Sequence, residues 1–276
     1  TFGTNGFYQK YGGTELADSF TDSSPSTTFK QLWFNGITQY LRPATALQGS
    51  GGGYAFSIAW WSNRNSSGGQ FYTQMPSPTT TGRFQISAGT SWSVFFNGAT
   101  IITTDKSDFA KGTWYFHTVT RDGGTWKYYV DGSLDTTVTG ADTAQLYNGV
   151  PYISGRDYVL SPVGMQMVQF ATWNTELSSA NVTGLYDSGN KILNWETSYS
   201  SGMQSYYTMN NVSAGGATDT ASTIYDHSGN SNDATTYGTM TAPSVARPIT
   251  DNGDVINTRA QKKVGDSSIY FDGTGD

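Results

Sequence analysis

The stretch WYFHTVTRDGGTWKYYVDGSLDTTVT, residues 114–139, decides the fold of this chain. Aromatic or apolar residues alternate with polar ones through 114–120 and again through 126–130, which is the two-residue period of half-buried strands. The turns Asp122-Gly123-Gly124 and Asp131-Gly132 are built from residues that tolerate positive φ, as tight hairpins require. The stretch therefore predicts a three-stranded meander, and its apolar face needs a second sheet to cover it.

Strand patterns continue on both sides of this meander. Asn97-Gly98 is a two-residue turn, and Asn35-Gly36 predicts a hairpin between Leu32–Phe34 and Ile37–Leu41. Further strands are expected at residues 6–11, 54–61, 70–74, 83–87, 91–96, 100–104, 151–154, 164–173 and 204–209. In the strand at 54–61, regular alternation gives a core face of Phe56, Ile58 and Trp60 and an opposite face of Ser57, Ala59 and Trp61.

One helix is expected, and it follows the strand at 164–173. Ser178 offers an N-cap, and Val182, Leu185 and Tyr186 fall at helical spacing. Gly189 suits the C′ position, where the chain leaves a helix in the left-handed conformation.

Composition favours a turn-rich β protein without a basic surface. Aromatic residues make up 14% and charged residues only 13%, beside 33 glycines. The net charge of −6 excludes nucleic acid as a partner, because phosphate binding needs a basic face. Cysteine is absent, which excludes disulfides and thiolate metal sites. No apolar run approaches the roughly 18 residues of a membrane-spanning helix, so membrane insertion is not expected.

The two ends of the chain echo each other. Gly6-Phe7-Tyr8 matches Ser205-Tyr206-Tyr207, and Leu32–Gly36 matches Ile269–Gly273. An internal repeat, with one complete unit followed by the opening of the next, accounts for both echoes. The alternative is chance, since any β protein with Asn-Gly and Asp-Gly turns yields such matches.

Three segments resemble a known family, in the usual order and at the usual separations. FSIAWWSN, GTWYFHTVTRDGGTWKYYVDGSLDTTV and GMQMVQFATWNTELSSANVTGLYDSG are similar to laminin-G-like domains of the concanavalin A-like lectin/glucanase superfamily. The resemblance implies an antiparallel jelly-roll β-sandwich. It divides the chain into an N-terminal strand and linker at 1–28, the sandwich at 29–190 and a C-terminal extension at 191–276, which resembles the opening of a second repeat. The tract TFGTNGFYQKYGG is similar to segments that precede these domains in tailed-phage structural proteins.

Catalysis is not expected. Glycosidases of this fold carry two glutamates and an aspartate closely spaced on one strand, because glycoside cleavage needs two carboxyl groups a few ångströms apart. The three glutamates here, Glu15, Glu176 and Glu196, form no such cluster. His117 interrupts a strand, and His227 lies in a turn without the spacing of a triad.

Calcium is the cofactor to consider. The side chains of Asp226, Asn230, Asn232 and Asp233 place four oxygen ligands within eight residues, and hard cations take such ligands from loops. The alternative is an Asx-rich turn whose side chains bond their own backbone. Asp105 and Asp108 form a weaker candidate.

Aromatic residues are the best candidates for a ligand surface. Sugars present C–H faces that stack on Trp and Tyr, while nearby polar groups orient their hydroxyls. Trp61, Tyr72 and Trp92 are the first candidates, and the loop residues Arg156, Asp157 and Tyr158 add polar groups at the end of the sheet. Packing in the core competes for every one of these aromatics.

Two functions are therefore considered for this segment of a longer surface or virion protein. The first is a non-catalytic adhesion module that binds glycan or cell-surface polysaccharide, outside the cell or on a phage fibre. The second is a structural or decoration subunit that binds neighbouring copies or other surface proteins. The last strand, Ile269–Phe271, separates them: pairing with a neighbour favours assembly, and folding back onto the first unit favours adhesion.

Overall fold

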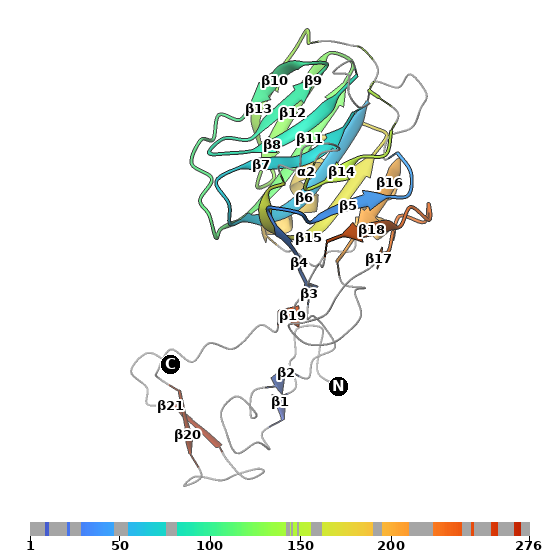
Figure 1. Cartoon of the computed structure of the whole chain (residues 1–276). Helices are drawn as coiled ribbons and strands as arrows, with labels where there is room; N and C mark the ends of the chain where they lie inside the picture. The colour runs from blue at the N-terminus through green and yellow to red at the C-terminus, as the bar shows by residue number, and fades with distance from the viewer. Residues whose placement is uncertain are drawn as a thin grey trace. The chain divides into compact units, whose positions relative to one another are not determined.

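A computed structural model describes residues 9–10, 21–22, 29–46, 55–75, 82–141, 144, 146–147, 149–155, 162–189, 195–209, 223–238, 244–245, 255–258 and 268–271. The chain forms two compact units, one of residues Phe29–Val245 and one of Thr1–Thr28 with Ala246–Asp276. The larger unit is a sandwich of two sheets whose named strands all pair antiparallel (Figure 1). The predicted all-β sandwich is thus confirmed.

The first sheet has eight strands in the order β10-β9-β8-β7-β14-β5-β18-β17. Four of them follow one another along the chain as a meander, and the other four come from three distant parts of the sequence. Their bounds are β5 Tyr40–Pro43, β7 Gly69–Gln74, β8 Phe84–Ala88, β9 Ser93–Phe96, β10 Ala99–Thr103, β14 Tyr152–Ile153, β17 Thr223–Ile224 and β18 Ala234–Tyr237.

The second sheet has seven strands, six in the order β13-β12-β11-β6-β15-β16, with β4 also paired to β15. It contains the predicted meander as β11, β12 and β13, closed by turns in which Gly123, Asp131 and Gly132 have positive φ. The bounds are β4 Leu32–Asn35, β6 Phe56–Arg64, β11 Trp114–Asp122, β12 Thr125–Val130, β13 Ser133–Val138, β15 Gly164–Trp173 and β16 Met203–Tyr207.

The predicted hairpin at Asn35-Gly36 is wrong, because the two flanking strands enter different sheets. Strand β4 pairs with β15, whereas β5 pairs with β14 and β18. The Asn35 side-chain oxygen accepts hydrogen bonds from the backbone N–H groups of Ile37, Thr38 and Gln39. This Asx turn redirects the chain from one sheet to the other, whereas the Asn97-Gly98 turn forms the predicted hairpin between β9 and β10.

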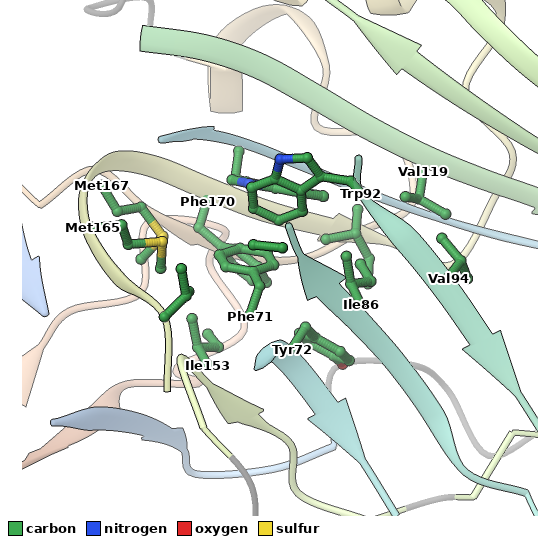
Figure 2. Close-up of a cluster of buried hydrophobic side chains, with 14 of the residues drawn as sticks. Phe71, Tyr72, Ile86, Trp92, Val94, Val119, Ile153, Met165, Met167 and Phe170 are labelled. Carbon is green, nitrogen blue, oxygen red and sulfur yellow. The ribbon is translucent and has the colours of Figure 1, made fainter. Parts of the chain in front are cut away.

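The central strands are covered on both faces. The predicted core face of β6 lies between the two sheets, where Phe56, Ile58 and Trp60 join one large apolar cluster. Figure 2 shows another part of this cluster, in which Trp92 lies over Phe71. The opposite face carries a second cluster, in which Trp61 packs with residues of α2 and α3. Covering of both faces explains why eight of the nine residues of β6 are buried.

Helix α2, Ser179–Tyr186, confirms the predicted helix and its N-cap, because the Ser178 side chain accepts a hydrogen bond from the Asn181 N–H. The left-handed residue at its C-terminus is Asp187 and not Gly189, which instead ends the 3-10 turn η1, Asp187–Gly189. A short second helix, α3, Trp195–Ser198, was not expected. Within the described part of the chain, no helix has the length and apolar character needed to cross a bilayer.

Strands β16, β17 and β18 join the sandwich although they follow residue 190 in the sequence. The first of them contains Ser205-Tyr206-Tyr207, one member of the predicted repeat, whose partner Gly6–Tyr8 lies outside the described residues. The division of the chain at residue 190 stays a prediction. Strand β3, Phe29–Lys30, pairs with β19, Ser244–Val245.

The smaller unit is described only by two strand pairs. Strand β1, Gln9–Lys10, pairs with β2, Thr21–Asp22. Strand β21, Ser268–Phe271, pairs with β20, Val255–Thr258. The trailing strand therefore pairs within its own chain, an arrangement that neither of the two expected outcomes included.

Candidate functional site

The three aromatic residues predicted to bind a ligand are buried. Tyr72 and Trp92 lie between the sheets with 0% and 1% of their surface exposed (Figure 2). Trp61 is 2% exposed, with its ring stacked 5.6 Å from that of Tyr186 in helix α2. The expectation that these rings are exposed is wrong, because the first two fill the inter-sheet core and helix α2 covers the third. None of them presents a ring face to a ligand.

The loop residues predicted to assist them, Arg156, Asp157 and Tyr158, lie outside the described residues. They directly follow Gly155, whose backbone approaches Tyr40 so closely that an added Cβ would lie 3.3 Å from the tyrosine Cβ. Their role in binding stays a prediction.

Tyr40, Arg42, Tyr152 and Tyr237 form a surface group on the outer face of the first sheet, which we call the tyrosine platform. Leu41 alternates with Tyr40 and Arg42 on β5 and points into the core with 0% exposure, so its two neighbours point outward. Tyr237 on β18 lies directly opposite Tyr40. On the other side of β5, Tyr152 of β14 alternates with a core residue in the same way.

The rings of the platform are packed against one another. Tyr40 and Tyr237 stack with ring centroids 4.7 Å apart and planes inclined by 7°. Tyr152 lies 5.4 Å from Tyr40, and the guanidinium carbon of Arg42 lies 4.1 Å above the Tyr152 ring. Arg42 Nη1 also donates a hydrogen bond to the Tyr152 hydroxyl at 2.5 Å. Tyr237 retains 43% exposure, so the platform offers an aromatic side chain to solvent.

The loop predicted to bind calcium holds β18 in place through hydrogen bonds. The Asp226 carboxylate accepts from the backbone N–H groups of Tyr206, Ser228 and Asn232 and from the Ser228 hydroxyl, at 2.7 to 3.0 Å. The Asp233 carboxylate accepts from the Asp226 N–H.

The two asparagines of this loop are also engaged. The Asn232 side-chain oxygen accepts from the Thr45 N–H, and the Asn230 amide donates to the Met203 carbonyl. The alternative to calcium, an Asx-rich turn that bonds its own backbone, describes only part of this arrangement. Asp226 bonds the loop's own N–H groups at Ser228 and Asn232, whereas Tyr206, Thr45 and Met203 lie elsewhere in the chain. Among the residues that the structure describes, no group of three or more His, Cys, Asp or Glu side chains could hold a metal ion.

Glu176 and His117 take part in structural contacts. Glu176 forms an ion pair with Lys127 at 2.8 Å and also accepts a hydrogen bond from Thr120. His117 is buried and stacked on Trp60, and its Nδ1 is 3.1 Å from the Tyr128 hydroxyl. Burial and the nearby Arg64 lower the pKa of His117 to about 3. Glu15 lies outside the described residues.

Sequence reasoning missed the platform because its members come from three distant segments. Tyr40 and Tyr237 become neighbours only when β18 pairs with β5. The available signal was the alternation Tyr40-Leu41-Arg42, which places an aromatic and a cation on one face of a strand.

Comparisons with known proteins place this fold in a family. A laminin-G-type family model described as the concanavalin A-like lectin/glucanases superfamily matches residues 35–183, more than half of the chain. No curated protein sequence matches. The structure of a Bacteroides ovatus protein named as a candidate carbohydrate-binding protein is similar at a TM-score of 0.53 and 14% identity, covering 84% of this chain and 68% of that one.

Two further structures are similar at a lower level. A heptameric SAP-like pentraxin from Limulus polyphemus has a TM-score of 0.49 and 12% identity, covering 58% of this chain and 83% of that one. A botulinum neurotoxin type C structure, whose cell entry depends on two ganglioside molecules, has a TM-score of 0.39 and 19% identity, covering 49% and 36%. The family match rests on the sequence, and the two-sheet sandwich agrees with it. The chain therefore belongs to the concanavalin A-like lectin/glucanases superfamily, in which it is a laminin-G-like domain.

Proposed function

We propose that this chain is a non-catalytic carbohydrate-binding module of a larger surface or virion protein and that the tyrosine platform is its binding surface. The observation that carries the proposal is the Tyr237 ring, which is 43% exposed while stacked on Tyr40. Aromatic faces bind the C–H faces of sugar rings, and a few polar groups beside them fix orientation. The Arg42 guanidinium and the Tyr152 hydroxyl provide such groups.

The platform is also rigid enough to bind without a large ordering cost. Its residues stand on three neighbouring strands, and sheet-borne groups are held more firmly than loop-borne ones. Tyr237 is supported from behind by Tyr40, and a tyrosine has only two side-chain torsions to restrict. The Asp226 hydrogen bonds fix the turn that leads into β18.

Binding is favoured over hydrolysis by the surroundings of Glu176. Hydrolysis of a glycoside needs two carboxyl groups flanking the scissile bond, one of them a proton donor. Glu176 is held in an ion pair with Lys127 and accepts a hydrogen bond from Thr120, so its carboxylate already has structural partners. It also follows β15 of the second sheet, whereas the platform belongs to the first.

A glycan array tests this proposal with three proteins. Wild type should bind, and Tyr237→Ala should bind the same glycans about 2- to 10-fold more weakly, the range expected for one aromatic stacking contact. Trp33→Ala is the matched control, because Trp33 is a 37% exposed aromatic on β4 of the other sheet. Its affinity should equal that of wild type. Equal losses in both variants, or none in Tyr237→Ala, would contradict the platform as the site.

The same array, run with added calcium and again with chelator, tests a calcium site at Asp226. A cation would have to replace backbone donors that already occupy this carboxylate. We therefore expect the same binding under both conditions. Binding abolished by chelator and restored by calcium would instead place a cation in the loop.

The second candidate function, a structural subunit that binds neighbouring copies, is favoured by a different surface. Trp33 and Ile37 are 37% and 67% exposed at the β4–β5 turn. Two results together would support this function. The folded wild-type protein should bind no glycan on the array, and it should self-associate in analytical ultracentrifugation to an extent that Trp33→Ala reduces. A monomer at all concentrations would contradict it.

A further inference from the structure

Arg42 is a cation whose charge has no acidic partner in the described part of the chain. Ion pairs in that part join Lys106 to Asp108 and Lys127 to Glu176. A guanidinium has five N–H donors, and the one hydrogen bond described for Arg42 goes to the neutral Tyr152 hydroxyl. Its Nε is buried and has no hydrogen-bond partner among the described residues. The described residues therefore leave most of its donor capacity unused.

Two other arginines show how this fold holds a guanidinium for structural purposes. Arg64 donates to the carbonyl oxygens of Ser67 and Phe109, both at 2.8 Å. Arg121 donates to the carbonyl oxygens of Gly123 and Ala144, both at 2.9 Å. Arg42 lacks described carbonyl bonds of this kind, and its contacts are with the face and hydroxyl of Tyr152. A ring beneath the guanidinium orients it and leaves its donor edge available to a ligand.

The Arg42 guanidinium and the uncovered face of Tyr237 lie on opposite sides of Tyr40, a separation that fits two units of one oligosaccharide. Tyr237 is opposite Tyr40, and Arg42 stands two residues further along β5 on the same face. Diagonal neighbours of this kind lie about 7–8 Å apart. Tyr40 covers the face of the Tyr237 ring that is turned toward β5, and the Arg42 guanidinium lies over Tyr152 on the other side of β5. A carboxylate at Arg42 therefore belongs to a different sugar unit from the one stacked on Tyr237. Thr235, opposite Arg42, is an exposed residue without a charge that would compete.

We propose that the tyrosine platform selects acidic oligosaccharides, with one sugar ring stacked on Tyr237 and the carboxylate of another unit accepting hydrogen bonds from Arg42. This inference rests on the proposed glycan-binding function and names its ligand class. The planar fork of arginine matches a carboxylate in a bidentate pair, which is stronger than a bond to a neutral hydroxyl. A polyphosphate backbone is disfavoured as the anion, because the chain carries a net charge of −6.

The test compares each acidic probe with its own neutral counterpart. Oligogalacturonate, hyaluronan oligosaccharides and sialyllactose are titrated beside the same compounds after reduction of their carboxyl groups to alcohols, with a sulfated neutral oligosaccharide as a separate arm. Wild type should bind at least one acid about 10- to 100-fold more tightly than its reduced form, which is the range for a charge-assisted bond. Added salt should weaken only the binding of the acid.

Three variants test whether Arg42 causes the preference for the acid over its reduced form. Arg42→Gln should remove the difference between acid and reduced form, and Arg42→Lys should retain part of it, because a lysine keeps the charge without the fork. Lys106→Gln removes a cation paired with Asp108 away from the platform and should leave the difference intact. Thermal melts establish that each variant is folded, and the salt dependence of wild type serves as a test that needs no variant.

The outcomes separate this inference from the proposed function. Equal binding of acid and reduced form, or a preference that persists in Arg42→Gln, would overturn the acid selection and leave glycan binding intact. Binding of the sulfated sugar alone would overturn the carboxylate assignment. Failure of wild type to bind any probe in either form would overturn the acid selection, and failure on the glycan array as well would overturn glycan binding.

Discussion

Two groups of stacked aromatic rings in this molecule differ in their exposure to solvent. Trp60 lies 5.0 Å from the His117 ring at 15°, and it has no exposed surface. Tyr40 and Tyr237 stack at 4.7 Å and 7°, yet Tyr237 is 43% exposed. The difference lies in what covers each face of the sheet and not in the residue types. Ring stacking alone therefore does not distinguish a core residue from a surface residue.

The largest effect expected from this comparison is on the interior group. Trp92→Ala removes a ring that packs against Trp60, Phe71 and His117, and truncation of a buried aromatic costs about 3–5 kcal/mol in the free energy of unfolding. Chemical denaturation measures this loss. Trp33→Ala, at a partly exposed tryptophan, should cost about 1 kcal/mol or less. A cost at Trp92 as small as that at Trp33 would contradict its assignment to the core.

The next effect concerns the loop that holds the platform strand. Asp226→Ala removes an acceptor of four hydrogen bonds and should lower the free energy of unfolding by about 2–3 kcal/mol. Asp226→Asn keeps one acceptor oxygen and should cost less. Sugar affinity should fall in Asp226→Ala as well, because the turn before β18 positions Tyr237. Unchanged stability in both variants would show that the loop does not support the platform.

The interior group also makes stability depend on pH through His117. Its pKa is lowered to about 3 in the folded protein by burial and the charge of Arg64, against about 6.5 in the unfolded chain. As pH falls from 6.5 toward 3, the unfolded state takes up the proton first, so the folded state loses stability by up to about 1.4 kcal/mol per pH unit.

Urea denaturation at pH 6.5 and pH 5 measures this change in the free energy of unfolding. The free energy of unfolding of wild type should fall by about 1.5 kcal/mol more than that of His117→Gln between these two pH values. His227→Gln, at the exposed histidine of the Asp226 loop, is the matched control and should lose as much as wild type. A His117→Gln variant with the full pH dependence would place the effect elsewhere.

The smallest effect on stability is expected on the platform itself. Tyr237→Ala removes a ring that is 43% exposed and should change the free energy of unfolding by about 1 kcal/mol or less. The same variant should show the weakened glycan binding described above. Tyr237→Ala should thus weaken binding with little loss of stability, whereas the main effect expected of Trp92→Ala is a loss of stability. A large loss of stability in Tyr237→Ala would assign the ring to packing.

Local patterns in the sequence predicted most of the strands and turns correctly, but not β17 and β18. The meander at 114–139 and the strand at 164–173 are found as β11 to β13 and β15 because alternation and turn residues are local properties. Helix α2 was predicted from its cap and spacing for the same reason. The hairpin at Asn35-Gly36 failed because the Asn35 side chain, and not a strand partner, takes up the following N–H groups.

The candidate site could not be predicted in the same way, because it depends on which surfaces are covered. Trp61 does point away from the main core, as alternation predicted, but helix α2 and Trp195 bury that face too. The pairing of β18 with β5 joins Tyr40 to Tyr237, and no local pattern reveals a partner so distant in sequence. Arg42 gains its importance only from this pairing and from the ring of Tyr152.

The most direct test of the account is to observe the contact between a bound sugar and the platform. In protein with isotope-labelled tyrosine rings, intermolecular nuclear Overhauser effects report which ring lies against the sugar C–H protons, and Tyr237→Phe assigns the signal. We predict effects to the ring of Tyr237 and none to the exposed Tyr225 or the buried Tyr72. Effects to Tyr225 alone, with the Tyr237 ring unaffected at saturating sugar, would contradict the platform as the binding surface.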